Sequence, residues 1–457
     1  MFQRELPESE KYLMKKNQVS NDEASIFRLN IDCLEEIFEY LSLIEVTAMG
    51  ETCKQMQQIA GEYFQRNYKS AEKFSAIDGI YTVYTKRQGV MNQRTQTSIF
   101  NQFINYISHY YEEIEPLYYI QLHGDNLSSI NHLYLVCLTI DAIKLECLQT
   151  VLSKIEILQL KQCRMFGDFN DGFLKYCKKL KRLYIQDDLG DIVDENGNPW
   201  LLRQYKTLEF MQMTLRYPFK ILELSTFFER NPSIRGFSTS SRCLWENRHE
   251  LLKSNIQLDR LEIQMLDNFY RQFIDIRLIC ELLNQLHARG FYQRLHLYVK
   301  RIDMKSSELL TMLGGLEHLS IKQFNESFSI HKLIHLKELT IFDGACTSEM
   351  DILATGLISL ERIQIQNAAF NDIRPFIRRS MKLSKLKLTL KNETHEKTVD
   401  IVTLNEERKQ LIGARKVTIY LPDHVFLETK WTTNNGNTNL NMVEMKRADS
   451  YDWEKRC

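Results

Sequence analysis

Proline and glycine are scarce in this sequence, and long apolar runs are missing. Its 457 residues include 7 Pro and 17 Gly, so extended low-complexity linkers rich in these residues are not expected. The longest apolar-rich run, Leu133 to Ile140, is far too short to span a bilayer. The first 25 residues are charged throughout and contain no apolar segment, so we expect no secretory signal. These absences predict a cytoplasmic or nuclear protein that does not enter a membrane.

Net charge and catalytic motifs are absent as well. Lys and Arg together number 59, and so do Asp and Glu, so neither nucleic acid nor an anionic membrane is expected as the main partner. The ten Cys include no C-x-x-C pair and should stay reduced in such a compartment. Phosphate-loop, nucleophile-elbow, zinc-protease and dinucleotide-binding motifs do not occur. We therefore predict no catalytic residue, metal ligand or cofactor, and expect the function to lie in binding surfaces.

Residues 29–60 have the pattern of a small helical docking module. Leu34, Ile37, Phe38 and Leu41 follow helical spacing, which gathers four large apolar groups on one stripe. Asn30 is a good N-cap, and further short amphipathic stretches follow at 44–52 and 53–64. Three helices of this size cannot bury all these side chains among themselves, so part of the surface should meet a partner. The alternative is a helical cap on the domain that follows.

The same stretch resembles the F-box, a motif that starts with Leu-Pro, continues with Ile-Phe and Leu, and closes on Val-Cys-Lys and an aromatic residue. The departures are Asn30 for Pro, Val46 for Leu, Thr52 for Val and Met56 for an aromatic residue. The resemblance implies contact with a Skp-family adaptor, which bridges to the cullin and RING subunits of a ubiquitin ligase. The residues that it implicates in adaptor binding, or in the small core behind the adaptor face, are Leu29, Leu34, Ile37, Phe38, Leu41, Val46, Cys53 and Met56.

A short pattern, L-x-x-L-x-L with aliphatic substitutions, recurs twelve times after about Leu117. Its central residues are spaced 20 to 34 residues apart, mostly within the period of leucine-rich repeats. Such a unit cannot bury its own leucines, so neighbouring units must stack. The resemblance predicts an α/β fold: a leucine-rich repeat horseshoe with a parallel sheet on its concave face, helices outside, and a small all-α module at the N-terminus. The central residues are Leu133, Leu158, Leu183, Met211, Phe237, Leu261, Leu295, Leu319, Leu339, Ile363, Leu386 and Val417.

These patterns divide the chain into five parts. We expect a flexible segment at 1–26, the F-box-like module at 27–66, and a helical connector and cap at 67–116, with its clearest helix at 97–114. A solenoid of about 12 repeats should follow at 117–428 and end on a closing strand after Pro422, before a polar C-terminal tail at 429–457.

The concave face should carry the side chains that flank and separate the two core residues of each strand. Several of these are basic, and Arg binds carboxylate and phosphate groups through two parallel hydrogen bonds. We therefore predict that this face binds an acidic or phosphorylated protein segment. In the alternative interpretation, these side chains are solvated and screen one another. The candidate residues are Arg182, Tyr184, Arg260, Arg294, His296, Arg362, Lys385 and Lys387.

Together, these resemblances imply a non-catalytic substrate receptor of an SCF-type ubiquitin ligase. The repeats would capture the target protein while ubiquitin transfer takes place on other subunits, so the chain contributes proximity. One alternative is a repeat scaffold without ubiquitin chemistry, and adaptor binding separates the two. An RNA-binding or nuclear-export adaptor is disfavoured, because the chain has no net charge and no long basic stripe.

Overall fold

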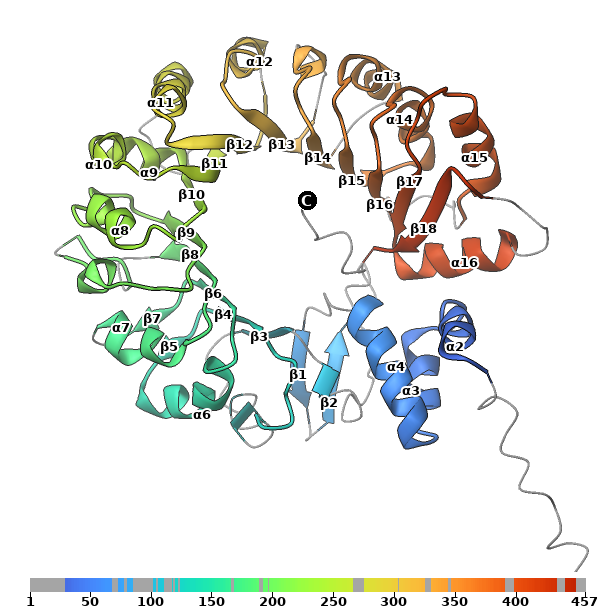
Figure 1. Cartoon of the computed structure of the whole chain (residues 1–457), viewed down its shortest axis with the longest axis horizontal. Helices are drawn as coiled ribbons and strands as arrows, with labels where there is room; N and C mark the ends of the chain where they lie inside the picture. The colour runs from blue at the N-terminus through green and yellow to red at the C-terminus, as the bar shows by residue number, and fades with distance from the viewer. Residues whose placement is uncertain are drawn as a thin grey trace, which may run out of the picture.

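The computed structural model describes most of the chain. The described residues are 29–67, 73–77, 80–84, 102–103, 106–110, 117, 120–121, 124–165, 168–188, 192–195, 197–265, 275–302, 304–324, 330–343, 347–390, 398–433 and 440–448. The segment 1–26, expected to be flexible, lies outside them. The described part curves into a ring with strands inside, helices outside, and three N-terminal helices between the ends of the sheet (Figure 1).

A parallel sheet of 14 strands lines the inside of the ring, and its spatial order follows the sequence from β3 to β18. Each of the twelve predicted L-x-L patterns lies on one of these strands, which confirms the α/β leucine-rich repeat solenoid. The strands are β3 (Tyr106–Tyr110), β4 (His132–Val136), β6 (Ile157–Lys161), β8 (Arg182–Asp188), β9 (Phe210–Leu215), β10 (Gly236–Ser240), β11 (Leu258–Met265), β12 (Tyr292–Val299), β13 (Leu316–Gln323), β14 (Glu338–Asp343), β15 (Arg362–Ala368), β16 (Lys385–Leu390), β17 (Val417–Leu421) and β18 (Val443–Arg447).

The outer side of the ring and the N-terminal module consist of helices and short turns. The N-terminal helices are α2 (Ile31–Phe38), α3 (Leu43–Gly50) and α4 (Lys54–Asn67). The outer helices are α6 (Ala142–Leu152), α7 (Phe169–Gly172), α8 (Leu224–Arg230), α9 (Ser241–Glu246), α10 (Arg248–Lys253), α11 (Ile276–Ala288), α12 (Met304–Leu310), α13 (Thr347–Gly356), α14 (Arg374–Arg379), α15 (Ile401–Lys409) and α16 (Asp423–Thr433). Single 3-10 turns at η3 (Leu174–Tyr176), η4 (Pro199–Leu202), η5 (Ile330–Lys332) and η6 (Phe370–Asp372) cover other repeats, and β5 (Thr139–Ile140) pairs with β7 (Arg164–Met165).

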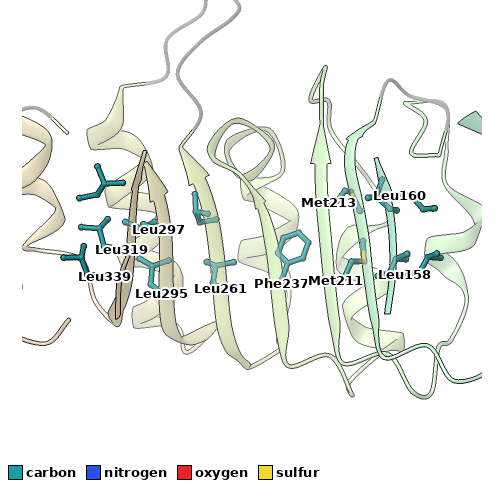
Figure 2. Packing of buried hydrophobic residues seen from close by; sticks show 14 of the residues in the cluster. Leu158, Leu160, Met211, Met213, Phe237, Leu261, Leu295, Leu297, Leu319 and Leu339 are labelled. Atoms are coloured by element: carbon teal, nitrogen blue, oxygen red, sulfur yellow. The ribbon is translucent and has the colours of Figure 1, made fainter. Parts of the chain in front are cut away.

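The core runs as two rows of apolar side chains between the sheet and the outer elements. Leu158, Met211 and Leu261 belong to one row, and residues two positions further along each strand form the second (Figure 2). Side chains alternate along a strand, so the residues between these rows face the inside of the ring. Cys163 is buried just after β6, and its thiol donates to the Leu135 carbonyl of the neighbouring repeat at 3.3 Å. The Cys163 thiol therefore links two neighbouring repeats.

The rows shift by two residues between β12 and β13. Leu295 pairs with Leu261 on β11, whereas Leu297 pairs with Leu319 on β13. Concave-face residues at equivalent repeat positions on β12 and β13 therefore do not stand side by side. Instead, His296 lies beside His318. Spacing alone could not reveal the shift, because both Leu295 and Leu297 fit the repeat pattern.

The connector at 67–116 differs from the expected helical region where it is described. A hairpin of β1 (Lys73–Ile77) and β2 (Ile80–Tyr84) follows α4. β3 then occupies part of the stretch predicted to be a helix, with Ile107 paired to Leu133 of β4. The prediction of a helix was wrong here because strand pairing with β4 outweighed a helix-like apolar spacing. β3 is the first strand of the sheet.

The C-terminal region also differs from expectation. The stretch after Pro422, predicted to be a closing strand, forms helix α16, which buries Val425, Phe426 and Thr429 on one face. β18 then lies within the range expected to be a polar tail, and its backbone amides at Met442 and Val443 donate to the Asn405 side chain. The solenoid therefore extends one strand beyond its expected end.

Candidate functional site

The starts of the first two N-terminal helices are fixed by local side chains. The Asn30 side chain accepts a hydrogen bond from the Cys33 amide at 2.8 Å and caps α2. Ser42 and Glu45 form a capping box at the start of α3, and these hydrogen bonds lower the pKa of Glu45. Asn30 therefore caps the helix at the position where the F-box usually has proline.

The predicted adaptor residues separate into a core set and a surface set. Leu34, Phe38, Val46 and Met56 are buried, and the Phe38 ring meets the edge of the Tyr63 ring of α4 at 5.3 Å. These four hold the three helices together and cannot touch a partner without rearrangement. Ile37, Leu41 and Cys53 are half-buried, and Leu29 is 40% exposed.

Two exposed apolar residues of this module were missed in the sequence. Ile31 is 54% exposed at the first position of α2, and Ile44 is 43% exposed near the start of α3. Ile31 precedes Leu34 by three residues and Phe38 by seven, so helical spacing was a signal that could have found it, whereas Ile44 lies beyond α2. With Leu29, they place exposed apolar surface at the N-terminal ends of two helices.

Comparison with known families agrees with this geometry. Residues 26–62 match the F-box domain. This chain carries an F-box domain. No curated protein matches the chain. A leucine-rich repeat protein of Leptospira interrogans aligns with 13% identity over 64% of this chain and 86% of that one. The TM-score of this alignment is 0.23. The repeat fold is shown by the 14-stranded parallel sheet itself.

The F-box domain joins the two ends of the solenoid. On one side, Gly61 of α4 lies against the ring of Phe103, which precedes β3, and a Cβ at Gly61 would overlap that ring. On the other side, Lys430 of α16 pairs with Glu36 and Glu39 of the F-box domain, at 3.1 and 2.6 Å. The ring is thus closed through the F-box domain (Figure 1).

The centre of the concave face carries a row of Arg, Glu and His side chains across β11 to β15. Glu262 forms an ion pair with Arg260 at 3.1 Å and lies 3.7 Å from His296. The row continues on the other side of the register shift, where Glu338 lies 3.6 Å from His318 and 3.3 Å from Arg362. The two imidazole rings stand between these pairs with their centroids 4.9 Å apart. We name this set the charge ladder: Arg260, Glu262, His296, His318, Glu338 and Arg362.

The ladder changes the interpretation of the predicted substrate face. Arg260 and Arg362 are already paired with carboxylates, and the Nε atom of Arg294 donates to the Asp259 carbonyl at 3.4 Å. The sequence placed the basic residues on the face, but it did not show that glutamates of the same face pair with them.

The other predicted residues flank the ladder. On one flank, Tyr184 of β8 packs against Phe210 at 5.1 Å, and the exposed Arg182 precedes it on the same strand. On the other flank, Lys385 and Lys387 of β16 lie next to Arg362 and Gln364 of β15. Basic charge is therefore concentrated at the β16 flank, while the ladder between the flanks balances its own charge.

Among the described residues, no group of three or more His, Cys, Asp or Glu side chains is arranged to hold a metal ion. No described helix combines the length and apolar character needed to cross a membrane.

Proposed function

We propose that this protein is a substrate-recognition subunit of an SCF-type ubiquitin ligase in the cytoplasm or nucleus. The observation that carries the proposal is an F-box domain built into the closure of a repeat ring. The F-box domain would bind a Skp-family adaptor and, through it, the cullin and RING subunits. The concave face would hold the target protein. The chain itself would supply no catalytic group and would act by bringing its target to the transferring subunits.

The adaptor surface is proposed to include Leu29, Ile31 and Ile44, with Ile37 and Leu41 beside them. Leu29, Ile31 and Ile44 are the exposed large apolar side chains among the described residues of the F-box domain, and Ile37 and Leu41 are half-buried. Burying three such side chains against a partner provides a few kcal/mol at about 25 cal/mol per Å² of apolar area. That is enough for a hot spot at the centre of a protein interface.

Pull-down of a purified Skp-family adaptor tests this proposal. Ile31→Asp/Ile44→Asp places two charges on the proposed contact without entering the core, and we expect at least about 30-fold weaker binding, roughly 2 kcal/mol. The matched control is Ile412→Asp, at a position that is 91% exposed on the solenoid. Phe38→Asp is not diagnostic, because a carboxylate at that buried position would unfold the F-box domain.

Two results would count against the proposal. Equal binding by wild type and Ile31→Asp/Ile44→Asp would show that the adaptor contacts another surface. Failure of the wild type to bind any adaptor would remove the ligase role and leave a repeat scaffold as the better description.

For the target, we propose an acidic or phosphorylated segment that binds near β16 and competes with Glu338 for Arg362. Removing a competing carboxylate should then strengthen binding. We expect Glu338→Gln to bind a captured target more tightly than wild type and Lys385→Ala/Lys387→Ala more weakly, with both differences shrinking at high salt. If none of the three substitutions changes the affinity for the target, the target does not bind this face through its charges, and the proposal is wrong.

A further inference from the structure

The C-terminal end of α2 has no basic residue of its own. The last carbonyls of a helix lack partners within it and carry partial negative charge, so they attract cations and N–H donors. The last turn of α2 contains no Lys, Arg or His. A residue from the far end of the chain supplies both the donors and the charge.

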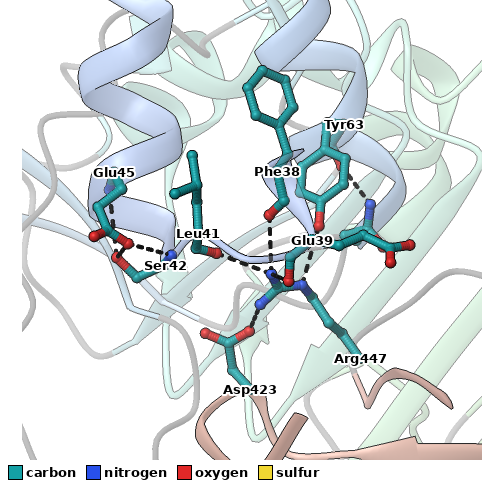
Figure 3. A network of polar contacts seen from close by, with 9 residues as sticks. Phe38, Glu39, Leu41, Ser42, Glu45, Tyr63, Asp423 and Arg447 are labelled. Atoms are coloured by element: carbon teal, nitrogen blue, oxygen red, sulfur yellow. Dashed lines mark hydrogen bonds and ion pairs between the residues drawn. The ribbon is translucent and has the colours of Figure 1, made fainter. Parts of the chain in front are cut away.

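That residue is Arg447 on β18, the last strand of the sheet. One terminal nitrogen of its guanidinium donates to the carbonyls of Phe38, Glu39 and Leu41, at 3.2, 3.2 and 2.9 Å (Figure 3). The other carries the ion pair to Asp423, the first residue of α16. Arg447 is 3% exposed, so these bonds are shielded from water.

Two aromatic residues complete the contact. The Arg447 Nε atom donates to the Tyr63 hydroxyl of α4 at 3.2 Å, and burial raises the pKa of Tyr63, which keeps that hydroxyl protonated. The guanidinium also lies over the Phe426 ring at 4.8 Å. Arg447 thus contacts α2, α4 and α16 together.

A more exposed set of contacts surrounds this one. Lys430 bridges Glu36 and Glu39 of the F-box domain, and Trp431 meets the edge of the Tyr40 ring at 5.5 Å. We call Arg447, Asp423, Lys430 and Trp431 the clamp.

Arg447 contacts the backbone carbonyl of Leu41, whereas Leu29 and Ile31 of the proposed adaptor surface lie at the other end of α2. Leu29 and Ile31 are at its N-terminus, whereas Arg447 binds its C-terminal carbonyls, about 12 Å away for a helix of eight residues. Leu34 and Phe38 are buried in the F-box domain, where Phe38 packs against Tyr63 of α4, and the same apolar cluster continues into the repeats. Loss of the clamp should therefore change how the domain is held without changing the surface that it offers.

We propose that Arg447 is a positioning residue: it fixes the orientation of the F-box domain relative to the concave face and contributes nothing to adaptor affinity. In the closed ring, a bound adaptor and a bound target keep a fixed distance and orientation relative to each other. Without Arg447, the F-box domain is held through the Gly61 side and the outer contacts of Lys430 and Trp431, and it turns relative to the repeats. The consequence for ubiquitin transfer rests on the proposed function, whereas the orientation itself does not.

Distance measurement on the full chain tests the orientation without any partner. Spin labels are placed at Cys33, which is exposed on α2, and at Ile334→Cys on the solenoid, with the other accessible cysteines changed to serine. We expect one narrow distance distribution for the wild type and a broad one for Arg447→Met, with Arg447→Lys between them. Arg379→Met, which removes an exposed ion pair to Asp351 on the outer side, is the matched control and should stay narrow.

Adaptor affinity separates positioning from folding. The Kd for a purified Skp-family adaptor should change by less than about threefold in Arg447→Met. In a complex reconstituted with cullin and RING subunits, the lysines of this chain that receive ubiquitin should spread to more positions. If the wild type binds no adaptor, the proposed function fails, and the distance distributions still decide the role of Arg447.

Three results overturn the proposal. A narrow distribution in Arg447→Met shows that other contacts fix the F-box domain, and a large loss of adaptor affinity in a folded variant shows that Arg447 supports the binding surface. If Arg447→Met does not fold, Lys430→Ala/Trp431→Ala, which changes only the outer contacts, takes its place. Partial broadening in that variant supports the clamp, and an unchanged distribution contradicts it.

Discussion

Arg408 gives the sharpest stability prediction, because it is a completely buried charge whose bonds are all to backbone carbonyls. It lies on α15 with 0% of its surface exposed. Its guanidinium donates to the carbonyls of Ile377, Ser380 and Leu383 at 2.9, 2.8 and 3.1 Å. It also donates to the carbonyls of Met381 and Arg415, at 3.2 and 3.1 Å. Burial lowers the pKa of Arg408 to about 10, still high enough for the group to remain charged at neutral pH.

Arg408→Met keeps most of the apolar stem and removes all five donated bonds. Each buried carbonyl left without a donor costs about 1–3 kcal/mol, while the variant no longer has to bury a guanidinium, which offsets part of the loss. We expect a net loss of about 4 kcal/mol in the free energy of unfolding of the C-terminal repeats. The stability of Arg408→Lys should fall between those of wild type and Arg408→Met, since one ammonium group cannot reach the carbonyls of all five residues.

Hydrogen exchange and urea unfolding measure this loss. Because repeats contact only their neighbours, exchange should accelerate from α14 to β18 and stay unchanged from β4 to β9. The control is Arg415→Met, a largely exposed arginine whose side chain pairs with Glu361. A loss below about 1 kcal/mol for Arg408→Met, or an equal loss for the control, would refute the argument that carbonyl capping by Arg408 holds these repeats together.

Three further predictions concern the closure of the ring. Asn405→Ala removes the acceptor for two backbone amides before and in β18 and should cost about 1–2 kcal/mol, seen as faster hydrogen exchange in β18 alone. Gly61→Val drives a side chain into the Phe103 ring and should lower stability by about 1–3 kcal/mol in thermal melts, whereas Gly172→Ala, whose added Cβ would lie 3.6 Å from the Met165 sulfur, should cost less. Burial lowers the pKa of Lys430, but hydrogen bonds and attraction to Glu39 and Glu36 outweigh this effect and raise the pKa above its ordinary value. The stabilisation by Lys430 is therefore complete below its ordinary pKa of 10.5 and is lost as the pH rises through its higher pKa in the folded protein. In urea titrations, the difference in unfolding free energy between wild type and Lys430→Met should disappear at strongly alkaline pH.

Local chemistry explains what could be inferred for the F-box domain and what could not. Asn30 and Ser42 start their helices through bonds to amides three residues away, so residue type and spacing in the sequence are enough to indicate such caps. The division of the apolar residues into a buried set and an exposed set was not legible. Phe38 and Ile31 are both apolar residues of α2, and only the packing of α4 decides which one is covered.

The concave face shows the same limit. Strand alternation placed Arg260 and Arg362 on it correctly. Arg260 pairs with Glu262 two residues further along β11, and Arg362 pairs with Glu338, its neighbour on β14. The two-residue shift between β12 and β13 places His296 beside His318 between these pairs, and the repeat spacing permits either register.

The sequence by itself determined the repeat fold, because each L-x-L pair must be buried by its neighbours and the twelve pairs recur at a spacing that permits stacking. Tertiary structure alone decided the closure. Arg447 and Phe38 are 409 residues apart, and nothing near Arg447 indicates that its donors will meet the end of a helix formed at the start of the chain. Contacts of this kind depend on the accumulated curvature of all 14 strands, which no local pattern encodes.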